Sequence, residues 1–247
     1  MRALVPAALI AGGLIAGGLI SAASARPERP QMRFASPAKA IAAEIAFAQL
    51  AQRKGQWTAF RETATEDAVM FVPQAVIARD WLKRQKNPPA SVAWQPYQTW
   101  LSCDGTLAVN MGPWQRPDGS QGYFTTVWQR QKKGEYKWVM DQGDVLATPL
   151  AAPEMIASSV AACDRKQARP PAGAIAPGGT IAPAPTFPAG TRGGWSEDRT
   201  LSWAVTVAAD CSRALTVSLY RGAGKPLETV LEKRVAALQP AAVCPLA

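Results

Sequence analysis

Residues 104–144 read DGTLAVNMGPWQRPDGSQGYFTTVWQRQKKGEYKWVMDQGD. They form three apolar segments separated by the turn sequences Pro117-Asp118-Gly119 and Lys133-Gly134. A period of two residues within such segments predicts β-strands, and short glycine-containing turns between them predict hairpins. The alternation is clearest in the middle segment, where one face carries Tyr123, Thr125 and Val127, and the other carries Phe124, Thr126 and Trp128. The stretch therefore predicts an antiparallel meander, and Asp104-Gly105 predicts a tight turn from an earlier strand at 92–101.

The segment before the meander predicts helices. Residues 37–63 carry apolar side chains at helical spacing, and Ser36-Pro37 has the composition of a helix start. Gly55 predicts a break before a second helix at 57–63. A short strand at 68–73 and a third helix at 77–86 are expected next. The core-facing stripe of the first helix is predicted to contain Ile41, Ile45 and Ala48, widened by Phe47, Leu50 and Ala51.

This order of elements predicts the fold class. Because helices and strands are segregated along the chain, we expect an α+β fold with helices covering one face of a bent antiparallel sheet. Residues 168–194 contain six prolines and six glycines, which predicts an extended linker. Strands are expected at 200–208 and 215–220, whereas 227–238 fits either a helix or a third strand. The predicted domains are a signal peptide at 1–25, an N-terminal extension at 26–36, an α+β domain at 37–167, the linker at 168–194 and a small β-rich unit at 195–247.

The first 25 residues have the pattern of a secretory signal peptide. Arg2 is the only charge before Arg26, the residues from 3 to 20 are small or apolar apart from Pro6, and Ala23-Ser24-Ala25 resembles a cleavage site. An uncleaved anchor is the alternative, because the apolar run approaches the roughly 20 residues that span a bilayer. The glycines and the cleavage pattern favour removal. We therefore expect a protein secreted to a bacterial periplasm, without a membrane-embedded part after cleavage.

The net charge is +9, or +8 once Arg2 is removed with the signal. Such a charge favours anionic partners, but the basic residues are scattered in small groups, and no nucleic-acid motif is present. The four cysteines predict two disulfides in an oxidising compartment. Three pairings are open, and we favour Cys103–Cys163 and Cys211–Cys244 because each pair then stays within one structural unit. We expect no metal site and no cofactor, since the chain has no histidine, no Cys-x-x-Cys pair and no phosphate-binding glycine loop.

A succession of short motifs resembles a known superfamily. It comprises Gly112-Pro113-Trp114, then Val127-Trp128-Gln129-Arg130-Gln131, and then Gly134-Glu135-Tyr136-Lys137-Trp138-Val139-Met140-Asp141. With the helical Ala43–Phe47 and with Phe71-Val72-Pro73, these motifs make residues 37–144 similar to the nuclear transport factor two-like superfamily, which includes SnoaL-like polyketide cyclases and ketosteroid isomerases. The motifs are typical of small secreted members without an assigned function.

The resemblance implies a cone, in which a bent sheet wraps a long helix and leaves a pocket at the open end. It also implies a homodimer through the outer face of the sheet. Enzymes of the superfamily place a carboxylate in the cone, often with His or Tyr. Without histidine, the candidate bases are Asp141, then Asp144, then Glu66 or Asp67, with Tyr97 or Tyr123 as donors. Strict alternation predicts that Asp141 points away from the core if Trp138 points into it.

The tryptophans and tyrosines of the sheet half suggest an aromatic pocket, although ordinary core packing would also use them. We favour a non-enzymatic protein that binds a small hydrophobic ligand or acts as a scaffold. A lyase or isomerase using a pocket carboxylate is the first alternative. A cell-envelope protein that binds anionic polymers is the second. The candidate pocket residues are Phe71, Trp94, Tyr97, Trp114, Tyr123 and Trp128.

Overall fold

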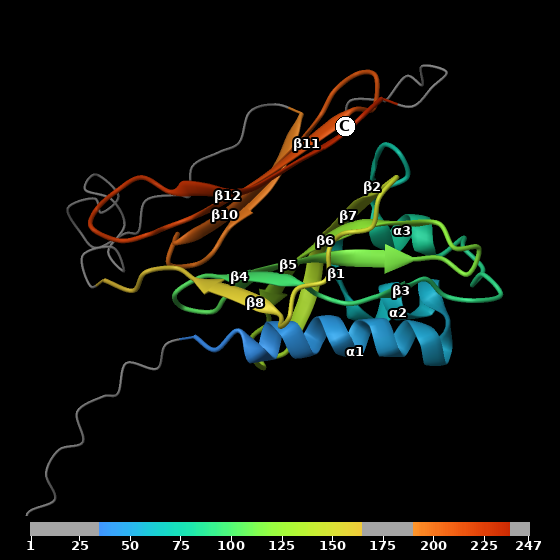
Figure 1. Ribbon diagram of the computed structural model, residues 1–247, viewed down its shortest axis with the longest axis horizontal. Coiled ribbons are helices and arrows are strands. Elements are labelled where there is room, and N and C mark those ends of the chain that lie inside the picture. Colours follow the sequence, from blue (N-terminus) through green and yellow to red (C-terminus); the bar gives the residue numbers. More distant parts are fainter. Residues whose placement is uncertain (1–34, 165–189, 238–247) are drawn as a thin grey trace, which may run out of the picture. The chain divides into compact units, whose positions relative to one another are not determined.

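The computed structural model describes residues 35–164 and 190–237 (Figure 1). Three helices form: α1 (Ala38–Lys54), α2 (Gln56–Thr63) and α3 (Ala78–Leu82). The strands of the first sheet are β1 (Ala64–Phe71), β2 (Ala75–Ile77), β3 (Ala93–Trp94), β4 (Gln98–Leu101), β5 (Leu107–Gln115), β6 (Gln121–Arg130), β7 (Tyr136–Val145) and β8 (Ala157–Val160). Those of the second sheet are β9 (Thr191–Trp195), β10 (Leu201–Val207), β11 (Arg213–Leu219) and β12 (Glu228–Val235). This is the α+β class that the sequence predicted.

The first sheet is built around the predicted meander. Its strand order is β2-β1-β7-β6-β5-β4-β8, and β3 pairs with β5. The neighbours β4, β5, β6 and β7 are antiparallel, whereas β1 pairs with β7 in parallel and β8 pairs with β4 in parallel. The short parallel strand β8 was not predicted, because only its pairing with β4, far back in the sequence, makes it a strand.

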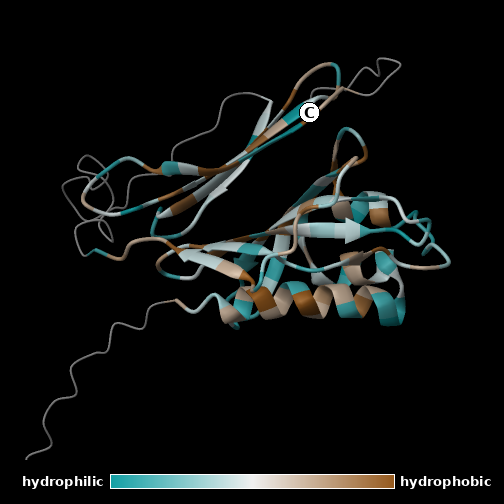
Figure 2. Cartoon of the chain, viewed as in Figure 1, coloured by the Kyte–Doolittle hydropathy of each residue, from teal (hydrophilic) through white to brown (hydrophobic). Residues whose placement is uncertain are grey.

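Helix α1 packs on one face of this sheet, as Figure 1 shows. Figure 2 shows apolar residues along its length and hydrophilic residues at its C-terminal end. Its buried stripe differs from the predicted one. The buried residues are Ala40, Glu44, Phe47 and Ala51, whereas Ile45 is 37% exposed. Phe47 and Ala51 are buried as predicted. The predicted centre of the stripe was wrong by about one residue because it assumed an apolar face, and the residue at the centre of the real face is an acid.

The second sheet has the order β12-β11-β10-β9, with all pairs antiparallel. Of the two alternatives left open for residues 227–238, the structure has the strand, at Glu228–Val235. The predicted linker ends early, since β9 begins at Thr191, whereas residues 168–189 lie outside the described residues. Packing requires glycine at position 194, because a Cβ there would lie 2.7 Å from Nε1 of Trp203.

The two faces of the first sheet belong to different cores. The inner face packs against the helices in a cluster that includes Phe47, Met70, Trp128 and Trp138. The outer face packs against the second sheet. The apolar cluster between them contains Trp100, Leu107, Val109, Val127 and Met140 from the first sheet, and Leu201, Trp203, Val205, Leu215, Val217, Leu219 and Leu231 from the second. A homodimer through this outer face, as the resemblance implied, would have to displace the second sheet.

The structure contains the expected disulfide between Cys103 and Cys163, which closes 60 residues of chain. Cys211 is also disulfide-bonded. Its expected partner, Cys244, lies outside the described residues, as does the predicted signal peptide at 1–25, so both stay predictions. Within residues 35–164 and 190–237, no helix has the length and apolar character needed to cross a membrane.

Candidate functional site

A pocket of about 280 Å³ lies between the helices and the inner face of the first sheet. Its walls are largely aromatic, and its polar groups lie mainly on β7. The aromatic lining residues are Phe47, Trp57, Phe60, Trp94, Trp114 and Phe124. The volume is just below the range of about 300–1,000 Å³ for ligand sites, and a mostly apolar lining with a few polar groups is typical of them.

The aromatic wall is held by contacts between its own rings. Phe47 on α1 makes edge-to-face contacts with Phe60 at 4.7 Å and with Trp94 at 4.8 Å between ring centroids. Trp57 contacts Phe60 in the same way at 5.4 Å. Such pairs add stability beyond the apolar area that they bury. The rings therefore form a fixed surface for a ligand rather than a loose cluster.

Glu44 lies under this wall and is fully buried. Its Oε1 accepts a hydrogen bond from the indole N–H of Trp94 at 2.8 Å. Its Oε2 accepts from the indole N–H of Trp128 at 2.7 Å and from Nδ2 of Asn110 at 3.2 Å. Burial raises the pKa of Glu44, and these hydrogen bonds oppose the rise. Glu44 thus fixes the indole of Trp94, a pocket-lining residue, through a side chain that sequence analysis did not select.

Asp141 also lines the pocket, although strict alternation predicted that it points away from the core. The register between β6 and β7 shifts at this point: Trp128 pairs with Trp138, but Val127 pairs with Met140. Val139 is therefore an extra residue on β7, which is a β-bulge, and a bulge reverses the side-chain alternation after it. Trp138 and Asp141 consequently face the same side. The prediction was wrong because the bulge depends on pairing across strands.

The surroundings of Asp141 favour its neutral form. Desolvation raises the pKa of Asp141 to about 8, and the nearby charge of Glu44 adds to the rise. A hydrogen bond from Oγ1 of Thr126 to Oδ2, at 2.9 Å, and the charge of Arg213 act in the opposite direction. The side chain is half-buried, so it is reachable from the pocket. At neutral pH most of the molecules therefore present a protonated carboxyl group, which can donate a hydrogen bond to an oxygen atom.

The other predicted pocket residues are distributed over several sites. Trp94 and Trp114 line the pocket, and Trp128 lies in the core beneath it. Tyr97 lines a neighbouring groove, which shares Trp94 and Trp114 with the pocket. Phe71 packs toward the cluster between the two sheets, with the guanidinium of Arg213 over its ring. Tyr123 is buried, with the ammonium group of Lys233 over its ring.

The remaining candidate acids also lie in different parts of the structure. Asp144 lines the pocket, on the same strand as Asp141. Glu66 and Asp67 are exposed on β1, where Glu66 pairs with Arg79. The sequence missed Phe47, Trp57, Phe60 and Phe124 as pocket residues, and Glu44 as the buried acid beneath them. A glutamate within the apolar period of the first helix was the one signal that could have identified Glu44. Among the residues that the structure describes, no three acidic or cysteine side chains gather as a metal site would need.

Comparisons with known proteins give a limited result. No protein-family model matches the chain, and no curated protein matches it. Among solved structures, a candidate ketosteroid isomerase from Parabacteroides distasonis is 14% identical, with a TM-score of 0.37, over 47% of this chain and 98% of that one. A candidate aromatic ring hydroxylase from Novosphingobium aromaticivorans is 18% identical, with a TM-score of 0.34, over 47% of this chain and 92% of that one.

Proposed function

We propose that this protein binds a small, flat, mostly apolar molecule that carries a carbonyl or hydroxyl oxygen. The observation that supports this is a half-buried carboxyl group, that of Asp141, in a pocket whose walls are aromatic. The rings offer apolar surface, and the carboxyl group offers one hydrogen bond that fixes the orientation of the ligand. Desolvation keeps Asp141 protonated at neutral pH, so a ligand oxygen fits the site better than an ammonium group does.

A matched pair of probes tests this proposal. We would measure the binding of 2-tetralone and of tetralin, which differ by one carbonyl oxygen, by ligand-observed NMR. Trp57→Ala should weaken the binding of both probes, because it removes part of the aromatic wall without touching the hydrogen bonds of Glu44. Asp141→Ala should weaken the binding of 2-tetralone about tenfold and leave tetralin unchanged, since one hydrogen bond of this kind contributes about 1.4 kcal/mol.

The control is Tyr97→Ala, because Tyr97 lines the neighbouring groove and not the pocket. It should change neither affinity. The wild-type protein should lose affinity for 2-tetralone, but not for tetralin, as the pH rises above about 8 and Asp141 ionises. If neither probe binds, or if Trp57→Ala and Tyr97→Ala act alike, the pocket is not the binding site.

Proton transfer is a second candidate function, and it rests on the same carboxyl group. A general acid or base works best when its pKa is near the working pH, and the pKa of Asp141 is about 8. When ionised, Asp141 could remove a proton from the carbon beside a carbonyl group. The test is deuterium exchange of 2-tetralone at C1 in D2O, followed by NMR. An exchange rate above that in buffer, abolished by Asp141→Asn, would support an isomerase or lyase. Equal exchange rates with and without the protein would rule out proton transfer and leave ligand binding as the proposed function.

We infer that the protein is exported to the periplasm. Two observations support this: residues 1–25 have the pattern of a signal peptide, and Cys103 and Cys163 form a disulfide, which persists in oxidising compartments. Mass spectrometry of the purified chain tests this, since cleavage after Ala25 leaves Arg26 as the first residue.

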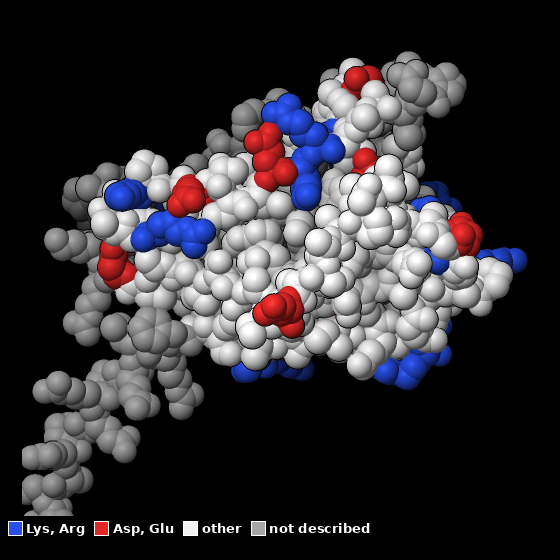
Figure 3. All heavy atoms as spheres, in the orientation of Figure 1, with Lys and Arg blue, Asp and Glu red and all other residues white. Residues whose placement is uncertain are grey.

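On the face drawn in Figure 3, basic and acidic side chains lie in small mixed groups. Among the residues that the structure describes, this face therefore has no continuous basic patch of the kind that would bind an anionic polymer.

A further inference from the structure

The chain contains one short motif twice. Residues 102–107 read Ser-Cys-Asp-Gly-Thr-Leu, and residues 196–201 read Ser-Glu-Asp-Arg-Thr-Leu. The pattern Ser-x-Asp-x-Thr-Leu is therefore repeated. The first copy connects β4 to β5, and the second connects β9 to β10.

The two copies fold in the same way. In each, the first oxygen of the aspartate accepts a hydrogen bond from the serine hydroxyl, at 2.6 Å for Asp104 and 2.7 Å for Asp198. The same oxygen accepts from the backbone N–H of the threonine, at 2.9 and 3.0 Å. The residue after the aspartate has a positive φ in both copies, +67° for Gly105 and +59° for Arg199. In both, the serine N–H bonds to the leucine carbonyl, which closes the turn.

The next turn along each sheet is repeated as well. Asp118-Gly119-Ser120 connects β5 to β6, and Asp210-Cys211-Ser212 connects β10 to β11. In each, the aspartate accepts from the serine N–H at 2.9 Å and from the serine hydroxyl at 2.7 Å. The middle residue again has a positive φ, +87° and +66°. The strand order β12-β11-β10-β9 thus repeats the order β7-β6-β5-β4. The turns correspond at two connections: that between β4 and β5 matches that between β9 and β10, and that between β5 and β6 matches that between β10 and β11.

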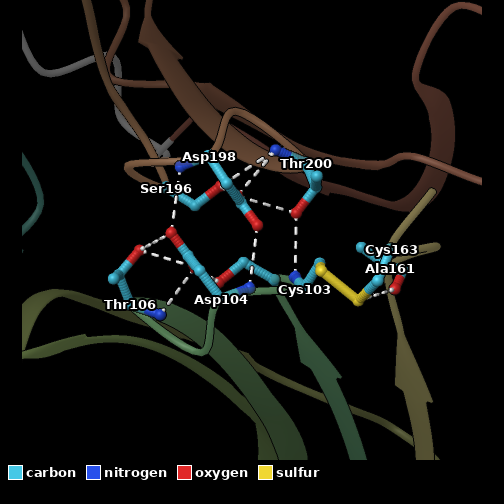
Figure 4. Close-up of a disulfide and its surroundings, with 9 residues drawn as sticks. Cys103, Asp104, Thr106, Ala161, Cys163, Ser196, Asp198 and Thr200 are labelled. Atoms are coloured by element: carbon cyan, nitrogen blue, oxygen red, sulfur yellow. Dashed lines mark hydrogen bonds between the residues drawn. A yellow bond between two sulfur atoms is a disulfide. The ribbon is translucent and has the colours of Figure 1, made fainter. Parts of the chain in front are cut away.

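The two copies of the first motif also bind each other, and they do so reciprocally (Figure 4). The N–H of Asp104 donates to Oδ2 of Asp198 at 2.7 Å, and the N–H of Asp198 donates to Oδ2 of Asp104 at 2.9 Å. The N–H of Cys103 donates to Oγ1 of Thr200 at 2.9 Å, and that of Glu197 donates to Oγ1 of Thr106 at 3.0 Å. Exchange of the same contacts in both directions is the mark of a two-fold interface between identical subunits.

The apolar faces behind these turns correspond too. Leu107 and Leu201 occupy the same place in their motifs, and both are buried in the cluster between the sheets. Val109 and Trp203, two residues further along β5 and β10, belong to the same cluster. The second sheet therefore covers the outer face of the first with an equivalent face of its own.

We propose that the second sheet is an internal repeat of the β4–β7 meander and takes the place of a partner subunit, so that the chain is a monomer with an internal pseudo-two-fold axis. The second copy consists of strands alone within 190–237, so it has no helices to enclose a pocket there. In the part of the chain that the structure describes, the aromatic pocket belongs to the first sheet and its helices and is not repeated behind the second sheet. The internal repeat does not depend on what that pocket binds.

Two measurements on the full chain, as the host processes it, test this proposal. Sedimentation equilibrium should give the mass of one chain at every concentration; a dimer would overturn the proposal. In urea unfolding, Asp104→Asn and Asp198→Asn should each raise the unfolding constant about tenfold, because each places an amide N–H against a backbone N–H. The two increases should be similar, since the two residues have equivalent places.

A double-mutant cycle shows whether the two copies touch in solution. The double variant of Asp104 and Asp198 should raise the unfolding constant by less than the product of the single effects, because the first change already weakens the shared contact. The matched control is the pair Asp118→Asn and Asp210→Asn. These residues belong to the other repeated turn and, among the described residues, bind only the serine of their own turn. Their effects on the unfolding constant should therefore multiply in the double variant. Multiplying effects at both pairs would overturn the proposal.

Discussion

Asp141→Asn should stabilise the protein at high pH and have little effect at low pH. The asparagine keeps the shape of the carboxyl group and an oxygen that can accept from Thr126, but it cannot ionise. In the wild type, the pKa of Asp141 is raised to about 8 in the folded state, against an ordinary value of 3.8. The unfolded chain therefore ionises first as the pH rises. The contribution of Asp141 to the free energy of unfolding is therefore largest below about pH 4. It falls as the pH rises from about 4 to about 8, and it does not change further above pH 8.

The size of the effect follows from the shift. A difference of about four pKa units, at 1.36 kcal/mol for each unit, gives about 6 kcal/mol. The stability advantage of Asp141→Asn over the wild type, measured as the difference in the free energy of unfolding, should therefore grow by about 6 kcal/mol between pH 4 and pH 9.

The assay is urea unfolding followed by tryptophan fluorescence at several pH values, with the disulfides intact. The difference between variant and wild type contains the ionisation of Asp141 and its interaction with the charge of Glu44, whose pKa is also raised. Asp67→Asn serves as the control, since Asp67 is exposed on β1. A difference that stays constant from pH 4 to pH 9 would show that Asp141 ionises like an exposed acid, and would refute the inference that the pocket desolvates it.

Three further predictions concern the framework of the pocket, and urea unfolding checks each of them. Glu44→Gln should destabilise the protein by about 2–3 kcal/mol, because an amide N–H₂ would face a buried indole N–H. Gly122→Ala should cost about 1–3 kcal/mol and disturb the fluorescence of Trp114, because the added methyl group would collide with the indole ring and with a backbone carbonyl. Replacing both Cys103 and Cys163 by alanine should cost about 4 kcal/mol, the entropy of closing a 60-residue loop.

The first two of these predictions have a control on the same chain. Glu62→Gln, at an exposed acid that pairs with Lys54 on the surface, should cost far less than Glu44→Gln. Gly134→Ala meets no atom within 4 Å, so only its backbone conformation should contribute. An effect of Glu44→Gln no larger than that of Glu62→Gln would contradict the inferred hydrogen-bond network.

The sequence by itself determined the meander and the α+β class, because alternation and turn residues act over short distances along the chain. It favoured the Cys103–Cys163 pairing among three that it left open. It did not determine what faces the pocket. The direction of Asp141 depends on a bulge at Val139, and the burial of Glu44 depends on indole donors 50 and 84 residues away. The same holds for the second sheet. Its Ser-x-Asp-x-Thr-Leu turn can be read in the sequence, but only folding brings Asp198 against Asp104, since a contact between residues 94 positions apart leaves no local pattern.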